Sequence, residues 1–96
     1  MSPDKLKKLE IIRNKLDTLD NSLIKLIKKR TLLVNEVLKL KKFKNQIVDN
    51  RRIHKILSQI RKKSIKNKID PKITKKIWIN MIRAYIDYER RNFKKK

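Results

Sequence analysis

The chain has 96 residues and a formal net charge of +21, and at this length we expect one domain over residues 1–96. It contains no Gly, no Cys and one His, which excludes a disulfide framework, leaves too few ligands for a zinc site and makes sheet hairpins scarce. No stretch of about 18 apolar residues is present, and no apolar signal core follows Met1. The composition therefore predicts an all-α protein of the cytoplasm, without metal or membrane.

The positive charge has a compositional explanation as well as a functional one. Clustered Lys and Arg side chains bind phosphates and would suit nucleic acid. The chain also holds 22 Lys, 15 Ile and 8 Asn, which are residues with A- and T-rich codons. A genome drifting toward A+T would produce such a surface without selection for a polyanion. We therefore do not expect nucleic acid to be the main partner.

Three helices are predicted along the chain. Ser2 and Pro3 suit a helix start, and nothing interrupts that helix until residues 42–46, which gives about 60 Å of rod at about 1.5 Å per residue. A second helix is expected from Val48–Asp49 to Lys66. The third begins at Asp70–Pro71 and runs toward Phe93. Its inner stripe is predicted to comprise Ile73, Ile77, Trp78, Met81, Ile82, Tyr85 and Glu89.

The first helix carries an apolar seam that is interrupted by charges. The seam follows a 3-4 heptad spacing through Leu6, Leu9, Arg13, Leu16, Asp20, Leu23, Ile27, Arg30, Val34, Val37 and Lys41. A charge on such a seam is costly unless it is paired, and three cations here share the seam with one acid. An anionic ligand would balance them. The length of the rod indicates a homodimer, in which antiparallel packing brings Arg13 of one copy toward Arg30 and Lys41 of the other.

A simpler interpretation is that Arg13 and Arg30 lie at the edge of a coiled coil and pair with Asp17 or Glu36. Polar residues on the other helices favour a ligand site instead. Arg52 lies one turn before Ile56 and is predicted to face inward, as is Glu89. Arg51 and His54 are expected at the surface.

The run from Leu9 to Asp20, the run from Leu23 to Arg30, and the following Val37 and Lys41 resemble the AroQ-type, all-helical chorismate mutases. The resemblance extends from about residue 6 to residue 93. It implies an intertwined three-helix homodimer with two shared sites that rearranges chorismate to prephenate, for phenylalanine and tyrosine synthesis, without a cofactor.

The resemblance also implies roles for individual residues. Lys41 and Glu89 would donate hydrogen bonds to the ether oxygen whose bond breaks. The substrate-binding residues would be Arg30, Arg52, Asp49 and Tyr85, together with Arg13 from the second copy. The cavity wall would consist of Val37, Ile53, Ile82 and Ile86.

Two departures from the family pattern keep alternatives open. The family commonly has an acid at the position of Ile53, and the loop between Lys41 and Asp49 is about one residue shorter than usual. Isochorismate pyruvate lyases share the fold, and they tend to be apolar at the position of Ile53 and aromatic near Tyr85. A basic helical dimer that binds nucleic acid without catalysis is a second alternative.

Overall fold

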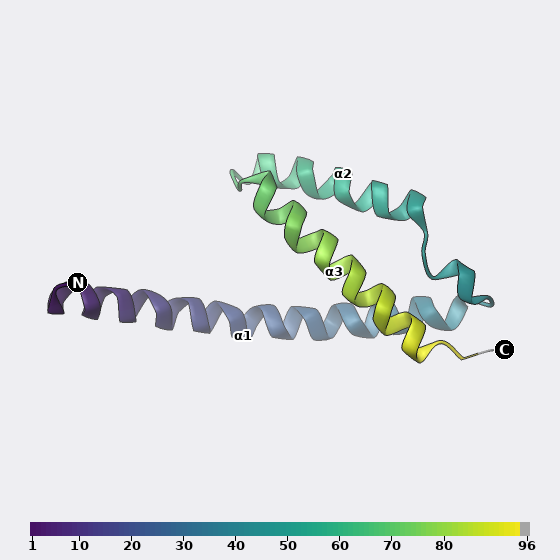
Figure 1. The fold of residues 1–96 in the computed structure, drawn as a ribbon, viewed down its shortest axis with the longest axis horizontal. Helices are drawn as coiled ribbons and strands as arrows, with labels where there is room; N and C mark the ends of the chain where they lie inside the picture. Colours follow the sequence, from purple (N-terminus) through teal and green to yellow (C-terminus); the bar gives the residue numbers. More distant parts are fainter. Residues whose placement is uncertain (95–96) are drawn as a thin grey trace. The chain divides into compact units, whose positions relative to one another are not determined.

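The computed structural model describes residues 1–94, which form three α-helices and one short 3-10 helix, without any strand (Figure 1). The elements are α1 (Pro3–Leu40), η1 (Lys44–Gln46), α2 (Asn50–Lys66) and α3 (Pro71–Asn92). The predicted all-α class is confirmed. α1 ends slightly before residues 42–46, because the N–H of Lys41 bonds the carbonyl of Leu38 at 3.1 Å and closes the last turn.

A side-chain cap fixes the start of each of the three helices. Ser2 Oγ accepts the backbone N–H three residues further on, at 3.3 Å. Asp49 Oδ1 accepts the N–H of Arg52 at 3.1 Å, and Asp70 Oδ1 accepts the N–H of Lys72 at 2.9 Å. Each cap satisfies a backbone donor that has no partner within the helix.

The chain divides into two compact units, the first of which is Met1–Val34. This unit consists of the N-terminal part of α1, and none of its residues is buried. Large apolar side chains along it are exposed to between 45% and 65%: Leu6, Ile11, Ile12, Leu16, Leu19, Leu23, Ile24, Leu26, Ile27, Leu32 and Leu33. A single helix cannot remove this much apolar surface from water.

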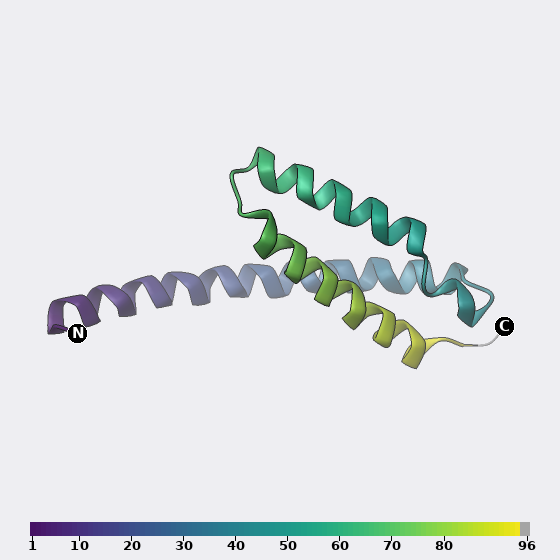
Figure 2. The ribbon, with the colours of Figure 1, turned by 45° about the horizontal axis from the view of Figure 1, so that its top comes forward.

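The second unit begins at Asn35, and within it α2 and α3 lie side by side (Figures 1 and 2). The two helices are held at their connected ends by a hydrogen bond of 2.6 Å between the hydroxyls of Ser64 and Thr74. The turn between them places Lys68 at a φ of 57°. This left-handed position after a helix usually takes Gly, which the chain lacks.

The inner face of α3 differs from the predicted stripe at its beginning. Ile73 and Ile77 are 55% and 48% exposed, so their predicted inward position was wrong. Because α3 meets α2 through Thr74, the neighbouring Ile73 is turned away from the contact. Among the apolar residues of the described chain, those that are buried are Leu38 and Ile47. No helix within residues 1–94 has the length and apolar character needed to cross a bilayer.

Candidate active site

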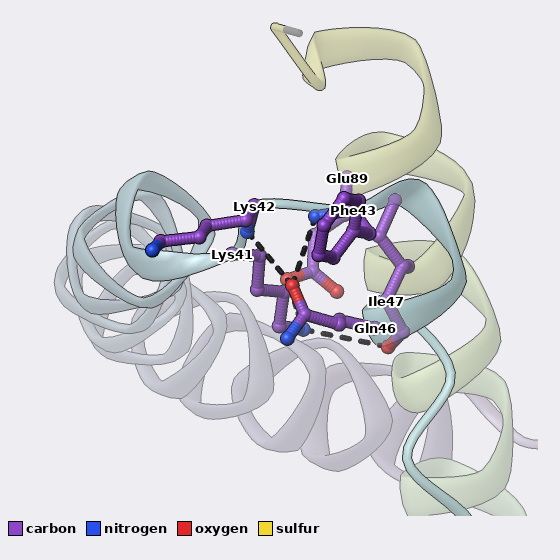
Figure 3. A network of polar contacts seen from close by, with 6 residues as sticks. All are labelled: Lys41, Lys42, Phe43, Gln46, Ile47 and Glu89. Carbon is purple, nitrogen blue, oxygen red and sulfur yellow. Dashed lines mark hydrogen bonds and ion pairs between the residues drawn. The ribbon is translucent and has the colours of Figure 1, made fainter. Parts of the chain in front are cut away.

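The centre of the candidate site is an ion pair between the end of α1 and the last turns of α3 (Figure 3). Lys41 Nζ lies 3.1 Å from Glu89 Oε1 and donates a second hydrogen bond of 3.4 Å to the carbonyl of Ile47. The Lys41 side chain is 19% exposed and that of Glu89 is 8% exposed. Glu89 thus faces inward as predicted, and Lys41 lies against it.

This environment determines what the pair can do. Removing a carboxylate from water is costly unless a cation compensates its charge, and Lys41 supplies that cation. An ammonium group has three N–H donors, of which two have the partners just described. The third can donate to an oxygen of a bound molecule. The pair therefore consists of an ammonium donor in a fixed position and a carboxyl group, which can donate a hydrogen bond only when it is protonated.

The short loop after α1 positions the carbonyl that holds Lys41. Gln46 Oε1 accepts the backbone N–H groups of Lys42 at 2.7 Å and Phe43 at 2.9 Å, which folds residues 42–46 into a tight bend (Figure 3). The next residue, Ile47, is only 4% exposed. Sequence reasoning missed both Gln46 and Ile47. A single Gln and a single Ile in a polar loop give no periodic signal, so this arrangement had to be seen in the structure.

Two of the predicted site residues, Asp49 and Arg52, lie at the start of α2. Asp49 is exposed, and its side chain caps α2. Arg52 is exposed too, so the prediction that it faces inward was wrong. The reason is that the inner face of α2 passes through Ile53, Ile56 and the buried Ser64, and Arg52 lies beside that face. The guanidinium of Arg52 is accessible to a molecule that binds there.

On α3, Tyr85 is half-buried and its ring meets that of Tyr88 edge-on, with centroids 6.5 Å apart. Tyr88 in turn donates a hydrogen bond of 2.7 Å to Asn35 Oδ1, which ties α3 to the end of α1. Three residues of the predicted cavity wall, Ile53, Ile82 and Ile86, are half-buried. The fourth, Val37, is 50% exposed.

The two remaining predicted residues, Arg13 and Arg30, belong to the first unit, where Arg13 is exposed and Arg30 is half-buried. The structure therefore brings Lys41 and Glu89 together within the second unit and places these two arginines in the other one. The seam acid Asp20 is exposed in the same way as Arg13.

Two open cavities of about 480 and about 430 Å³ lie in the second unit, and neither is lined by a predicted site residue. The larger lies between α2 and α3, and the smaller lies between the ends of α1 and α3. Within residues 1–94, no group of three or more His, Cys, Asp or Glu side chains is placed to hold a metal ion.

These observations define an all-helical protein in which a lysine directly after the first helix pairs with a buried carboxyl group of the third. A family model described as chorismate mutase type II matches residues 12–90, and the chain belongs to that family. The match includes Arg13, Arg30, Lys41 and Glu89. The curated proteins contain no match to the chain, and neither do the solved structures.

Proposed function

We propose that this protein is a chorismate mutase, which rearranges chorismate to prephenate on the route to phenylalanine and tyrosine. The observation that carries the proposal is the contact of 3.1 Å between Lys41 and the buried Glu89, within the region that matches the family. The rearrangement is pericyclic, so the enzyme has to select a compact substrate conformer and stabilise charge. Neither task needs a cofactor.

Negative charge grows on the ether oxygen of chorismate as its bond breaks. Lys41 is suited to donate to this oxygen, because Glu89 and the Ile47 carbonyl already hold its ammonium group in place. A donor fixed before the reaction needs no reorganisation in the transition state. Glu89 would be the second donor, in its protonated form, since an ionised carboxylate would repel the developing charge.

The two carboxylates of chorismate would be bound by arginines. In this proposal Arg30 and the accessible Arg52 bind them with charge-assisted hydrogen bonds, and Tyr85 contributes its hydroxyl. Arg13 would come from a second copy of the chain. Asp49, whose side chain already caps α2, would contact the ring hydroxyl largely through its backbone.

This arrangement would require a homodimer of single-domain chains. The exposed apolar side chains of residues 1–34 need a cover that this unit does not provide for itself. A second copy packed antiparallel along α1 would supply that cover and bring Arg13 toward Arg30 and Lys41 of the first copy. A location in the cytoplasm stays a prediction.

The alternative activity is that of an isochorismate pyruvate lyase. Ile53 favours it, because this half-buried apolar side chain stands where the family commonly binds the substrate ring hydroxyl with an acid. The half-buried aromatic ring of Tyr85 fits the same alternative.

Product analysis separates the two activities. The purified protein is incubated separately with chorismate and with isochorismate, and the products are identified by chromatography and mass spectrometry. We expect prephenate from chorismate. Salicylate and pyruvate from isochorismate, with no prephenate from chorismate, would replace the mutase by the lyase. No turnover together with steeply salt-dependent binding to nucleic acid would favour the non-enzymatic alternative.

A further inference from the structure

A groove between α2 and α3 has no role in the proposed mutase reaction. It is the cavity of about 480 Å³, and it lies between the middle of α2 and the start of α3. Its lining consists of His54, Leu57, Ser58, Ile60, Arg61, Pro71 and Lys75. None of these residues was assigned to the catalytic centre or to substrate binding.

The groove has an apolar floor and a basic rim. Leu57, Ile60 and Pro71 are half-buried and form the floor. The exposed rim residues on α2 are His54, Ser58 and Arg61, which are four and three residues apart and therefore share one face of the helix. The rim residue on α3 is the exposed Lys75.

The lining residues of the groove include no Asp or Glu that could neutralise the basic rim. The acid nearest in sequence is Asp70, which adjoins Pro71, and its Oδ1 accepts the backbone N–H of Lys72 at 2.9 Å. Between Asp49 and Asp70 the sequence has eight Lys and Arg residues and no Asp or Glu. The rim therefore lies in a positive electrostatic potential, which would attract an anion.

We propose that this groove binds a small amphipathic anion, with an apolar or aromatic body and one anionic head group. The body would cover the apolar floor, and the head would meet Arg61 and Lys75. Arg presents a planar fork of donors that matches a carboxylate, and the volume falls within the roughly 300–1,000 Å³ usual for small-molecule sites. A bare polyanion such as nucleic acid would use the rim and leave the floor uncovered.

The only His of the chain, His54, gives a direct probe, because its ring protons report occupancy of the groove in an NMR spectrum. The purified full-length protein is titrated at constant pH and salt with phenylacetate, with the uncharged phenylacetamide, and with inorganic phosphate. We expect a saturable shift of the His54 signals with phenylacetate. Affinity for phenylacetamide and for phosphate should be lower by about fivefold or more, since each lacks one of the two contacts.

Charge variants then locate the binding. Arg61→Gln and Lys75→Gln should each weaken phenylacetate binding by about fivefold. Lys62→Gln is the matched control, because it removes the same charge from the adjacent residue of α2, which does not line the groove. It should change the affinity by less than about twofold.

Several results would overturn the proposal. One is an equal loss of affinity in the Arg61 and Lys62 variants, which would indicate attraction by net charge alone. Another is a His54 shift that does not saturate, or one that phenylacetamide, phosphate or a short single-stranded oligonucleotide produces equally well. A Lys41→Met variant should keep the shift. Loss of the shift in that variant would place the anion in the catalytic centre. The test reads the His54 signals alone, so its result does not depend on whether the protein turns over chorismate.

Discussion

Replacing Lys41 with Met should destabilise the protein, because it leaves Glu89 as a buried carboxylate without its cation. Met keeps most of the apolar length of the lysine side chain, so the change tests charge more than packing. The replacement also removes the hydrogen bond of 3.4 Å to the Ile47 carbonyl, which anchors the loop after α1.

The exposure of the two side chains sets the magnitude. Exposed ion pairs contribute about 0–1 kcal/mol, and breaking a fully buried pair by removing one partner costs about 3–5 kcal/mol. With side chains that are 19% and 8% exposed, this pair lies between the two cases but nearer to the buried one. We therefore expect the free energy of unfolding to fall by about 2–3 kcal/mol.

Urea unfolding measures this change at one fixed protein concentration, because the stability of the proposed dimer would depend on concentration. Lys39→Met is the control, since Lys39 is an exposed cation two residues earlier on α1. A double-mutant cycle with Glu89→Gln should give a coupling energy of about 1–2 kcal/mol. If the losses in Lys41→Met and Lys39→Met agree within about 0.5 kcal/mol, the ion pair does not contribute to stability as argued.

Three further predictions concern the reaction and the fold. Glu89→Ala should lower kcat by on the order of 10²–10³-fold, because it removes the second donor to the ether oxygen, whereas Glu89→Gln should keep activity, because an amide also donates; equal loss in the two variants would exclude this donor. Arg13→Ala and Arg30→Ala should each abolish turnover, yet a mixture of the two should recover activity after subunit exchange, since one hybrid site has both arginines; proven exchange without recovery would contradict a shared site. Lys68→Gly should stabilise the protein by about 1 kcal/mol in urea unfolding, because Gly suits the φ of 57° better, and no gain would mean that the turn carries no strain.

The helices and their starts could be predicted from sequence because their signals are local. Ser2, Asp49 and Asp70 are capping residues followed by helix-forming sequence, and the structure uses all three as caps. The inward position of Glu89 also followed from periodicity, since it continues the half-buried stripe of Tyr85.

Periodicity failed where a helix has more than one apolar side. Ile73 continues the apolar pattern of α3, but the contact with α2 is made by the polar Thr74, whose hydroxyl pairs with Ser64. Arg52 was predicted to face inward from its spacing to Ile56. The inner face of α2 instead includes the next residue, Ile53, and Arg52 is exposed. The role of Gln46 in shaping the loop depends on three-dimensional closure, which no spacing rule encodes.

The most direct test of the central claim is chorismate turnover by wild type, Lys41→Met and Lys39→Met, with prephenate measured as product and each protein shown to be folded. The proposed mechanism predicts that wild type and Lys39→Met form prephenate at similar rates. Lys41→Met should lose on the order of 10²–10³-fold in kcat, because it lacks the donor to the ether oxygen. Equal turnover by Lys41→Met and Lys39→Met, or no prephenate from the wild type, would contradict the assignment of the Lys41–Glu89 pair as the catalytic centre.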